Sequence, residues 1–142
     1  MGSNKDKTLD PKGKVVYGPY GEKVGDYTAV EEEVIITADG QEAEGAYIRW
    51  LIAEEDGAPL FALRTIRMKP GAKVPPHKHP WEHEIYVLRG KGMLWIEDRG
   101  YLLERGVFVY IPPNKLHYYY TVGEEELEFV CIIPNKPTVE EE

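Results

Sequence analysis

The four histidines of the chain lie close together in the sequence, and three of them fall in the run His77-Lys78-His79-Pro80-Trp81-Glu82-His83. The fourth, His117, follows a Pro-Pro-Asn turn. Neutral imidazole is the commonest protein ligand for divalent transition metals. Two histidines at positions i and i+2 of a strand project to the same face, because side chains alternate along a strand. The histidines therefore predict a site for one divalent transition metal.

Glycines, prolines and histidines recur at fixed spacings around this run. The first stretch reads Gly71, five residues, His77, one, His79, three, His83, six, Gly90. The second reads Gly106, five residues, Pro112, one, Asn114, two, His117, three, Thr121. The pattern resembles the two motifs of the cupin superfamily, G-x5-H-x-H-x3,4-E-x6-G and G-x5-P-x-G-x2-H-x3-N. Asn114 and Thr121 replace the usual Gly and Asn, and Asn tolerates the left-handed backbone of such a turn.

The resemblance covers about residues 45–134 and implies an all-β fold, the double-stranded β-helix (jelly-roll) cupin barrel with one metal ion inside. The ligands it implies are His77, His79, His83 and His117. The sequence is also similar to small single-domain cupins with four histidine ligands, some of which are manganese proteins of hyperthermophiles. Manganese is therefore the first expectation for the metal, followed by iron, nickel, copper or zinc.

The third ligand position is open to two interpretations, since cupins usually have Glu where this chain has His83. Glu84 fits the longer form of the first motif, but it leaves only five residues before Gly90. An inward His83 would bring Ile85 and Val87 inward with it, whereas an inward Glu84 would bring Tyr86 and Leu88. We favour His83, which fits both gaps. Four neutral imidazoles would leave the site with a charge of +2 and with open positions for water, substrate or O₂.

The elements that must position these residues are short β-branched and aromatic runs separated by Gly, Pro and Asp turns. The predicted strands are Glu33–Thr37, Ala46–Ala53, Pro59–Met68, His83–Leu88, Gly92–Glu97, Tyr101–Leu103, Val107–Ile111, Leu116–Thr121 and Glu126–Ile133. Such a series is typical of an antiparallel sandwich or barrel. We expect a flexible N-terminal tail over 1–14, a single cupin domain over 15–134 and an acidic C-terminal tail over 135–142.

Five residues are candidates for the substrate pocket. Tyr119 shares the face of His117 by strand alternation. Phe129, Cys131 and Ile133 share one face of the last strand, and the resemblance places that face toward the metal. Cys131 could equally be a small buried filler. Arg64 could hold an anionic substrate through bidentate contacts or form a surface salt bridge. No catalytic residue is assigned.

Composition restricts the partners. The net charge of −8 argues against nucleic acid and against an anionic membrane, which both require a basic surface. The single cysteine fits a reducing cytoplasm. A small-molecule substrate and, by similarity to other small cupins, a homodimer are expected. The scarcity of Asn, Gln and Cys is common in thermophiles.

Three functions follow as hypotheses. The first is a metal-dependent oxidoreductase that uses O₂ or a peroxide to oxidise or cleave a small organic substrate, as a dioxygenase does. The second is a metal-dependent isomerase or lyase acting on a sugar or keto acid, with the metal as Lewis acid. The third is a non-catalytic small-molecule binding module. The apolar character of the predicted pocket wall favours the first hypothesis over a sugar substrate.

Overall fold

The computed structural model describes residues 8–37 and 39–135. Its strands, in chain order, are β1 (Val15–Tyr17), β2 (Lys23–Gly25), β3 (Glu32–Ile36), β4 (Glu42–Ile52), β5 (Phe61–Met68), β6 (Lys73–His77), β7 (His83–Arg89), β8 (Lys91–Ile96), β9 (Arg99–Glu104), β10 (Phe108–Ile111), β11 (His117–Thr121) and β12 (Leu127–Pro134). Two 3-10 helices are described, η2 (Tyr27–Ala29) and η3 (Glu54–Asp56). Within the described ranges, no helix is long and apolar enough to cross a membrane.

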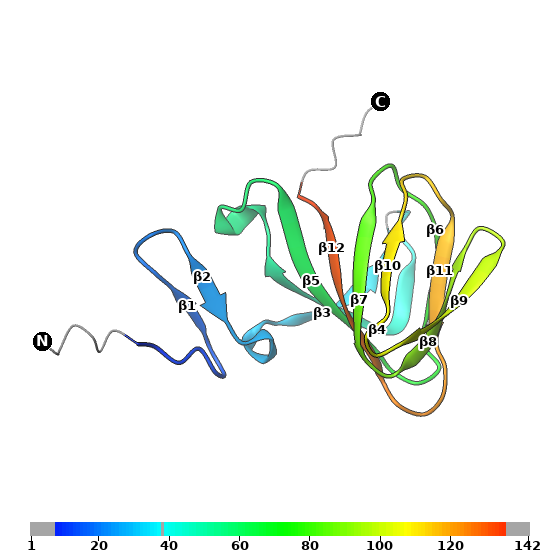
Figure 1. Cartoon of the computed structure of the whole chain (residues 1–142), viewed down its shortest axis with the longest axis horizontal. Coiled ribbons are helices and arrows are strands. Elements are labelled where there is room, and N and C mark those ends of the chain that lie inside the picture. Colours follow the sequence, from blue (N-terminus) through cyan, green and yellow to red (C-terminus); the bar gives the residue numbers. More distant parts are fainter. Residues whose placement is uncertain (1–7, 38, 136–142) are drawn as a thin grey trace, which may run out of the picture.

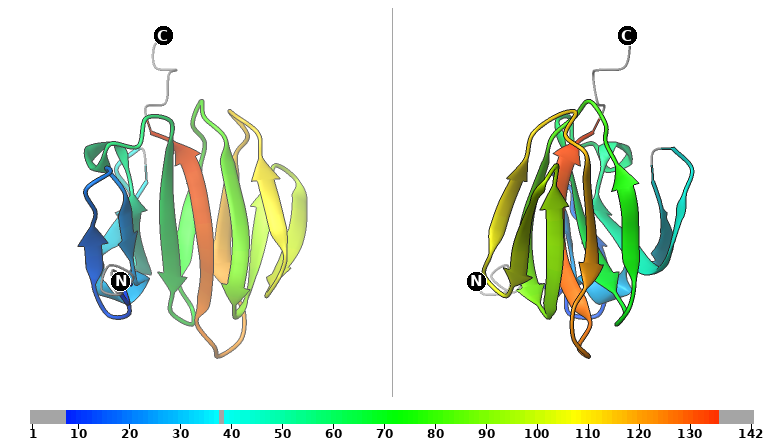
Figure 2. Two further views of the ribbon diagram at one scale, coloured as in Figure 1. Left: turned by 60° about the vertical axis from the view of Figure 1, so that its left-hand side comes forward. Right: turned by 90° about the vertical axis from the view of Figure 1, so that its right-hand side faces the viewer.

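The strands form two large antiparallel sheets that face each other, as Figure 1 and both views of Figure 2 show. The six-stranded sheet has the order β10-β7-β12-β5-β4-β3, and the four-stranded sheet has the order β6-β11-β8-β9. A separate hairpin, β1-β2, precedes them and extends to one side of the barrel (Figure 1). This is an all-β jelly-roll barrel, so the predicted fold class is confirmed.

One hydrophobic core fills the space between the two sheets. It forms because every second side chain of each strand points inward, as on β7, where His83, Ile85 and Val87 are all buried. The predicted inward register of His83 is therefore confirmed. The largest fully buried apolar side chains come from both sheets and include Phe129, Met68, Leu94, Leu103, Ile111 and Leu127.

All nine predicted strands are present, but three others were not predicted. Strand β6 contains Pro75 and Pro76, and prolines argue against a strand because they cannot donate to a ladder. β6 is nevertheless an edge strand, where the missing donor can face away from the sheet. β1 and β2 have only three residues each, too few to show the alternation that marks a strand. The domain boundaries stay a prediction, and residues 1–7 and 136–142 of the two predicted tails lie outside the described residues.

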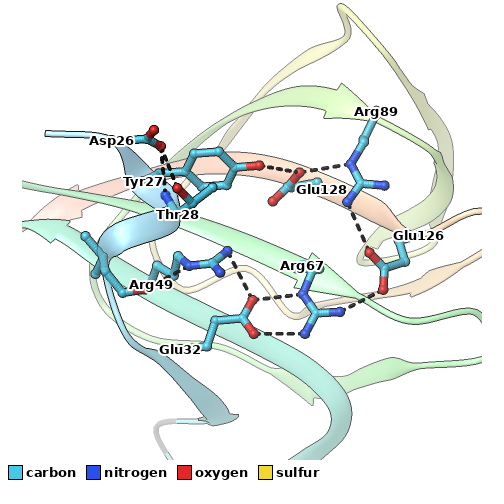
Figure 3. Close-up of polar contacts among 10 residues, drawn as sticks. Asp26, Tyr27, Thr28, Glu32, Arg49, Arg67, Arg89, Glu126 and Glu128 are labelled. Atoms are coloured by element: carbon cyan, nitrogen blue, oxygen red, sulfur yellow. Dashed lines mark hydrogen bonds and ion pairs between the residues drawn. The ribbon is translucent and has the colours of Figure 1, made fainter. Parts of the chain in front are cut away.

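A network of ion pairs covers the outer face of the six-stranded sheet (Figure 3). Arg67 donates to both carboxylate oxygens of Glu32 at 2.8 Å and to Glu126 at 2.7 Å. Arg89 links Glu126 to Glu128 at 3.1 and 3.0 Å. The network joins β3, β5, β7 and β12 with the loop before β12. Single exposed ion pairs contribute little, about 0–1 kcal/mol, but bidentate arginines in a network hold their partners in one geometry.

Two glycines of the cupin motifs show different constraints at tight turns. Gly90, between β7 and β8, has φ 80°, and Gly106, between β9 and β10, has φ 90°. A Cβ atom on Gly90 would collide with the backbone carbonyl of Glu126, whereas a Cβ atom on Gly106 would meet no atom within 4 Å. The first glycine is therefore required both by its backbone conformation and by close packing, the second only by its conformation.

We predict that Gly90→Ala lowers the free energy of unfolding by about 3 kcal/mol or more, because the backbone must move to relieve the collision. Gly106→Ala is the matched control. It should cost only about 1–2 kcal/mol, the strain of a left-handed alanine. Urea unfolding of both variants in metal-free buffer measures the difference. Equal losses in the two variants would show that packing at Gly90 is not tight.

Candidate metal centre

The four histidines come from both sheets and meet at one end of the barrel. His77 ends β6 and His117 begins β11, and these two residues are direct partners in the four-stranded sheet. His83 begins β7 of the six-stranded sheet. His79 lies in the loop between β6 and β7, which lies against the β10–β11 loop at the upper end of the barrel in Figure 1. The site can therefore form only when the two sheets pack together.

Three of the four histidines present ligand atoms to a common point. The ligand atoms of His77, His79 and His117 lie within 4.8 Å of one another. Two nitrogens bound to one ion at about 2.1 Å would be at most about 4.2 Å apart, so only a small closure is needed. The His83 ring stacks on that of His79 with centroids 4.5 Å apart, and its centroid is 5.4 Å from that of His117. His83 is thus adjacent to His79 and His117, and its role as fourth ligand stays a prediction.

Hydrogen bonds from the outer ring nitrogens fix the orientation of three imidazoles. The Nδ1 atoms of His77, His79 and His117 lie 2.9 Å from backbone carbonyls of Pro75, Trp81 and Lys115 respectively. A carbonyl oxygen only accepts, so each Nδ1 carries the proton and each Nε2 keeps its lone pair. Metal-binding histidines are generally oriented in this way.

The inner ring nitrogens lack partners. The Nε2 atoms of His79 and His117 are buried and have no hydrogen-bond partner. A buried polar atom without a partner costs free energy, so it needs an explanation. A divalent transition metal held by the Nε2 atoms would supply one. The residues present therefore fit the metal that the sequence predicts.

Burial also keeps three of the histidines, His79, His83 and His117, neutral. It lowers the pKa of His79 and of His117 to about 4. For His83, burial lowers the pKa well below the usual value, and the nearby Arg64 lowers it further. Neutral imidazole is the form that binds metal, so the site is ready for a cation at neutral pH.

Two turn residues hold the loops that carry the histidines. Asn114 adopts a left-handed backbone with φ 64°, as its position in the second motif predicts. Its backbone N–H donates to the carbonyl of His79 at 2.8 Å, which ties the β10–β11 loop to the histidine loop. Trp81 stacks on the His79 ring with centroids 4.4 Å apart and an interplanar angle of 5°. Together these contacts restrict the movement of His79, the one histidine outside a strand.

A cavity of about 360 Å³ adjoins the histidines. Its wall is mostly apolar and comes from β3, β4, β5, β6 and β12, with Ile35, Ile36, Ile48, Ile66, Val74 and Ile133 among the lining residues. Trp50 and the strand β3 also line it, and neither was predicted to be part of the pocket. The volume lies in the range typical of small-molecule sites.

The candidate pocket residues divide into two groups. Arg64, Tyr119 and Ile133 line the cavity, whereas Phe129 and Cys131 are not among its lining residues. Contact of any of these five residues with a substrate stays a prediction. Phe129 packs edge to face against Tyr119, with centroids 5.5 Å apart, and is fully buried. Strand alternation identified the inward face correctly, but the Tyr119 ring separates Phe129 from the cavity.

Cys131 lies between Arg64 and the histidines. Its Sγ atom is 2.8 Å from Arg64 Nη2 and 3.5 Å from His83 Nδ1. Complete burial raises the pKa of the Cys131 thiol, an effect that Arg64 opposes. Arg64 is only 8% exposed, so the surface salt bridge considered for it is ruled out. Cys131 therefore contacts the Nδ1 atom of His83, a predicted metal ligand.

The sequence is similar to those of several known proteins. The family model described as a cupin domain matches residues 64–133. An oxalate-binding protein from Thermotoga maritima is 30% identical over 93 residues, which cover 65% of this chain and 75% of that protein. The chain belongs to the cupin family. Family members include enzymes and binding proteins, so membership alone does not select one function.

A solved structure and two further relatives show the same similarity. The polyketide cyclase RemF from Streptomyces resistomycificus is 30% identical, with a TM-score of 0.73 over 81% of this chain and 80% of that one. Auxin-binding protein 1 from Arabidopsis thaliana is 31% identical over 95 residues. This cupin spans only 48% of auxin-binding protein 1 and 50% of an uncharacterized Methanocaldococcus jannaschii protein, about half of their lengths.

The depressed histidine pKa values predict acid sensitivity of the metal-free protein. Unfolded histidine binds a proton near pH 6.5, whereas folded His79 does so only near pH 4. The free energy of unfolding should therefore be at its full value above pH 6.5 and fall as the pH drops toward 4. Urea unfolding in the presence of a chelator, at several pH values across this window, measures it.

The matched control is His79→Gln, which removes one titrating group but keeps a polar side chain. Its stability should fall less than that of the wild type across the same window. Parallel curves for the two proteins would contradict the assignment of a neutral, buried His79.

Proposed function

We propose that this cupin is a metal-dependent oxidoreductase that oxidises or cleaves a small organic substrate, with O₂ or a peroxide as the oxidant. One observation carries the proposal: buried imidazoles with unpartnered Nε2 atoms lie beside a mostly apolar cavity. A structural metal site is normally closed by four protein ligands and has no reason to adjoin a cavity. A metal next to a substrate-sized space is typical of catalysis.

The metal would be held by His77, His79 and His117, with His83 as the fourth ligand. By resemblance to four-histidine cupins we propose manganese, with iron, nickel, copper or zinc as alternatives that imidazole also suits. When bound, the metal supplies Lewis-acid and redox chemistry. Four imidazoles would leave such an ion able to take a further ligand, and the adjoining cavity would provide room for a substrate.

The cavity wall supports an organic substrate with few polar groups. Tyr119 and Ile133 line the same cavity as His77, His79 and His83. A sugar would require many more hydrogen-bonding groups than this wall offers. Trp81 closes one side by stacking on His79. In this proposal the wall residues bind and orient the substrate beside the histidines.

The second candidate is a Lewis-acid reaction without net oxidation, which corresponds to the isomerase or lyase hypothesis. The similarity to the polyketide cyclase RemF favours this candidate.

The third candidate is a binding module without catalysis. The names of the oxalate-binding and auxin-binding relatives support this candidate. Both alternatives use the same cavity, so they differ from the first in the fate of the substrate rather than in the site.

Metal analysis and oxygen uptake test the proposal together. We expect protein purified without chelator to hold about one equivalent of transition metal, and the Mn- or Fe-loaded protein to consume O₂ with a substrate from a panel of small organic compounds. His117→Ala should bind the metal at least about tenfold more weakly than wild type, because the substitution removes a ligand. Arg105→Ala, at an exposed turn, is the control and should retain both properties.

The outcomes separate the candidates. Conversion of a substrate without O₂ or peroxide consumption would replace the oxidoreductase with the Lewis-acid reaction. Binding without conversion would favour the binding module. If no metal is bound and His117→Ala changes nothing, all metal-dependent functions are excluded.

We also propose that the protein acts on a small molecule as a homodimer, with neither nucleic acid nor a membrane as a partner. The support lies on the outer face of the six-stranded sheet, where Phe108 pairs with Tyr86. Phe108, Tyr110 and Tyr86 are 80%, 55% and 51% exposed. Exposed apolar patches of this kind mark interaction surfaces. The lone Cys131 supports a cytoplasmic location, and the scarcity of Asn and Gln supports a thermophilic origin.

Sedimentation analysis tests the dimer. The wild type should sediment at twice the chain mass of 16.2 kDa. Phe108→Asp should shift it to the monomer, because it places a charge in the patch. Leu102→Asp, on β9 of the other sheet and 47% exposed, should leave the dimer intact. A monomeric wild type, or a dimer insensitive to Phe108→Asp, contradicts this interface.

A further inference from the structure

A buried guanidinium without a counter-ion lies in the wall of the cavity. Arg64 is on β5, lines the cavity and is only 8% exposed. Its Nε atom is buried without a hydrogen-bond partner. Arginine is almost never buried unless it is paired, because desolvating a charge is costly. We therefore expect a group other than the described residues to pair with the Arg64 guanidinium.

Three other arginines of the six-stranded sheet differ from Arg64 in this respect. Arg49 and Arg67 both pair with Glu32, and Arg89 pairs with Glu126 and Glu128, all on the outer face of the sheet. Over residues 8–37 and 39–135, no carboxylate forms an ion pair with Arg64. These three arginines of the outer face thus have carboxylate partners, whereas the buried Arg64 of the cavity has none among the described residues.

The groups that do touch Arg64 hold it without neutralising it. Its Nη2 atom lies 2.8 Å from the Sγ atom of Cys131, and a neutral thiol is a weak acceptor. Its Cζ atom lies 5.0 Å from the centroid of the Trp50 ring, in a cation–π contact. The ring covers one side of the guanidinium, and Nε remains without a partner. The planar fork of donors is therefore fixed in place but not satisfied.

We propose that Arg64 binds the carboxylate of the substrate, and that the substrates are small carboxylates with an apolar body. A carboxylate accepts two parallel hydrogen bonds from a guanidinium and supplies the missing charge. The inference rests on the proposed function, in which the cavity is the substrate site. It narrows the unspecified organic substrate to one chemical class.

The position of Arg64 relative to the histidines explains how such a substrate is oriented. Cys131 contacts both Arg64 and His83, so the guanidinium is separated from the histidine cluster by one thiol group. Isoleucines such as Ile48, Ile66 and Ile133 form the wall around it. A carboxylate held on Arg64 brings its neighbouring carbon atoms between this apolar wall and the imidazoles.

Binding of carboxylates and their neutral amides tests the proposal. The probes are acetate, butanoate and benzoate, each compared with its amide by calorimetry at neutral pH. Metal-free protein is used first, because a carboxylate can also bind a metal directly. We expect at least one carboxylate to bind wild type tenfold or more tightly than its amide. In Arg64→Met this preference should disappear, while the affinity for the amide is unchanged.

The control is Arg105→Met, which removes the same charge from an exposed turn and should bind as wild type does. The measurements are repeated with zinc-loaded protein, where the loss caused by Arg64→Met should be of the same size. If no carboxylate binds more tightly than its amide, or if Arg64→Met keeps the preference, the proposal is wrong. An effect of Arg64→Met on zinc affinity alone also overturns it, because Arg64 would then only position His83 through Cys131.

Thermal unfolding establishes that each variant is folded. Should Arg64→Met not fold, Arg64→Lys decides, since it keeps the charge and loses the planar fork. It should bind the carboxylate severalfold more weakly than wild type and the amide equally well; unchanged carboxylate affinity contradicts the proposal. Metal content and O₂ uptake are measured separately. Their failure with an intact carboxylate preference would remove the proposed reaction but not the anion site.

Discussion

The hydrogen bonds between the outer ring nitrogens and backbone carbonyls are the constraint on which the site depends. They give His77, His79 and His117 one tautomer and turn three lone pairs inward. Each acceptor is a carbonyl two residues away along the chain, so the local backbone sets the orientation of the ring. Leaving the inner nitrogens without partners costs about 1–3 kcal/mol each, which the barrel core must offset in the metal-free protein.

The barrel brings the oriented histidines together in one place. His77 and His117 are paired across the four-stranded sheet, whereas His83 belongs to the opposite sheet. A group that binds all of them holds the two sheets together and binds only the folded chain. Metal binding and folding are therefore linked, and the same free energy appears both as affinity and as stability.

Much of the fold and part of the site could be predicted from the sequence, because spacing and alternation are local properties. The motif spacings predicted the histidines, the turn at Asn114 and the inward register of His83, Ile85 and Val87. Depth in the core is a non-local property, so alternation could not distinguish Ile133, which lines the cavity, from Phe129, which lies behind Tyr119. The proline-rich β6 shows the same limit, since whether a strand lies at a sheet edge depends on the complete fold.

Alternation along β5 also gives two arginines opposite roles. Arg67 faces outward and joins a network of glutamates, while Arg64, three residues earlier, faces the cavity without a carboxylate. A cation in the histidine cluster would add further positive charge near Arg64, and like charges disfavour each other. An anion between them lowers the energy of both. By linkage, an anion that improves metal binding must itself bind better to the metal-loaded protein. We therefore interpret the unpaired charge of Arg64 inside the barrel as part of a binding site for an anion.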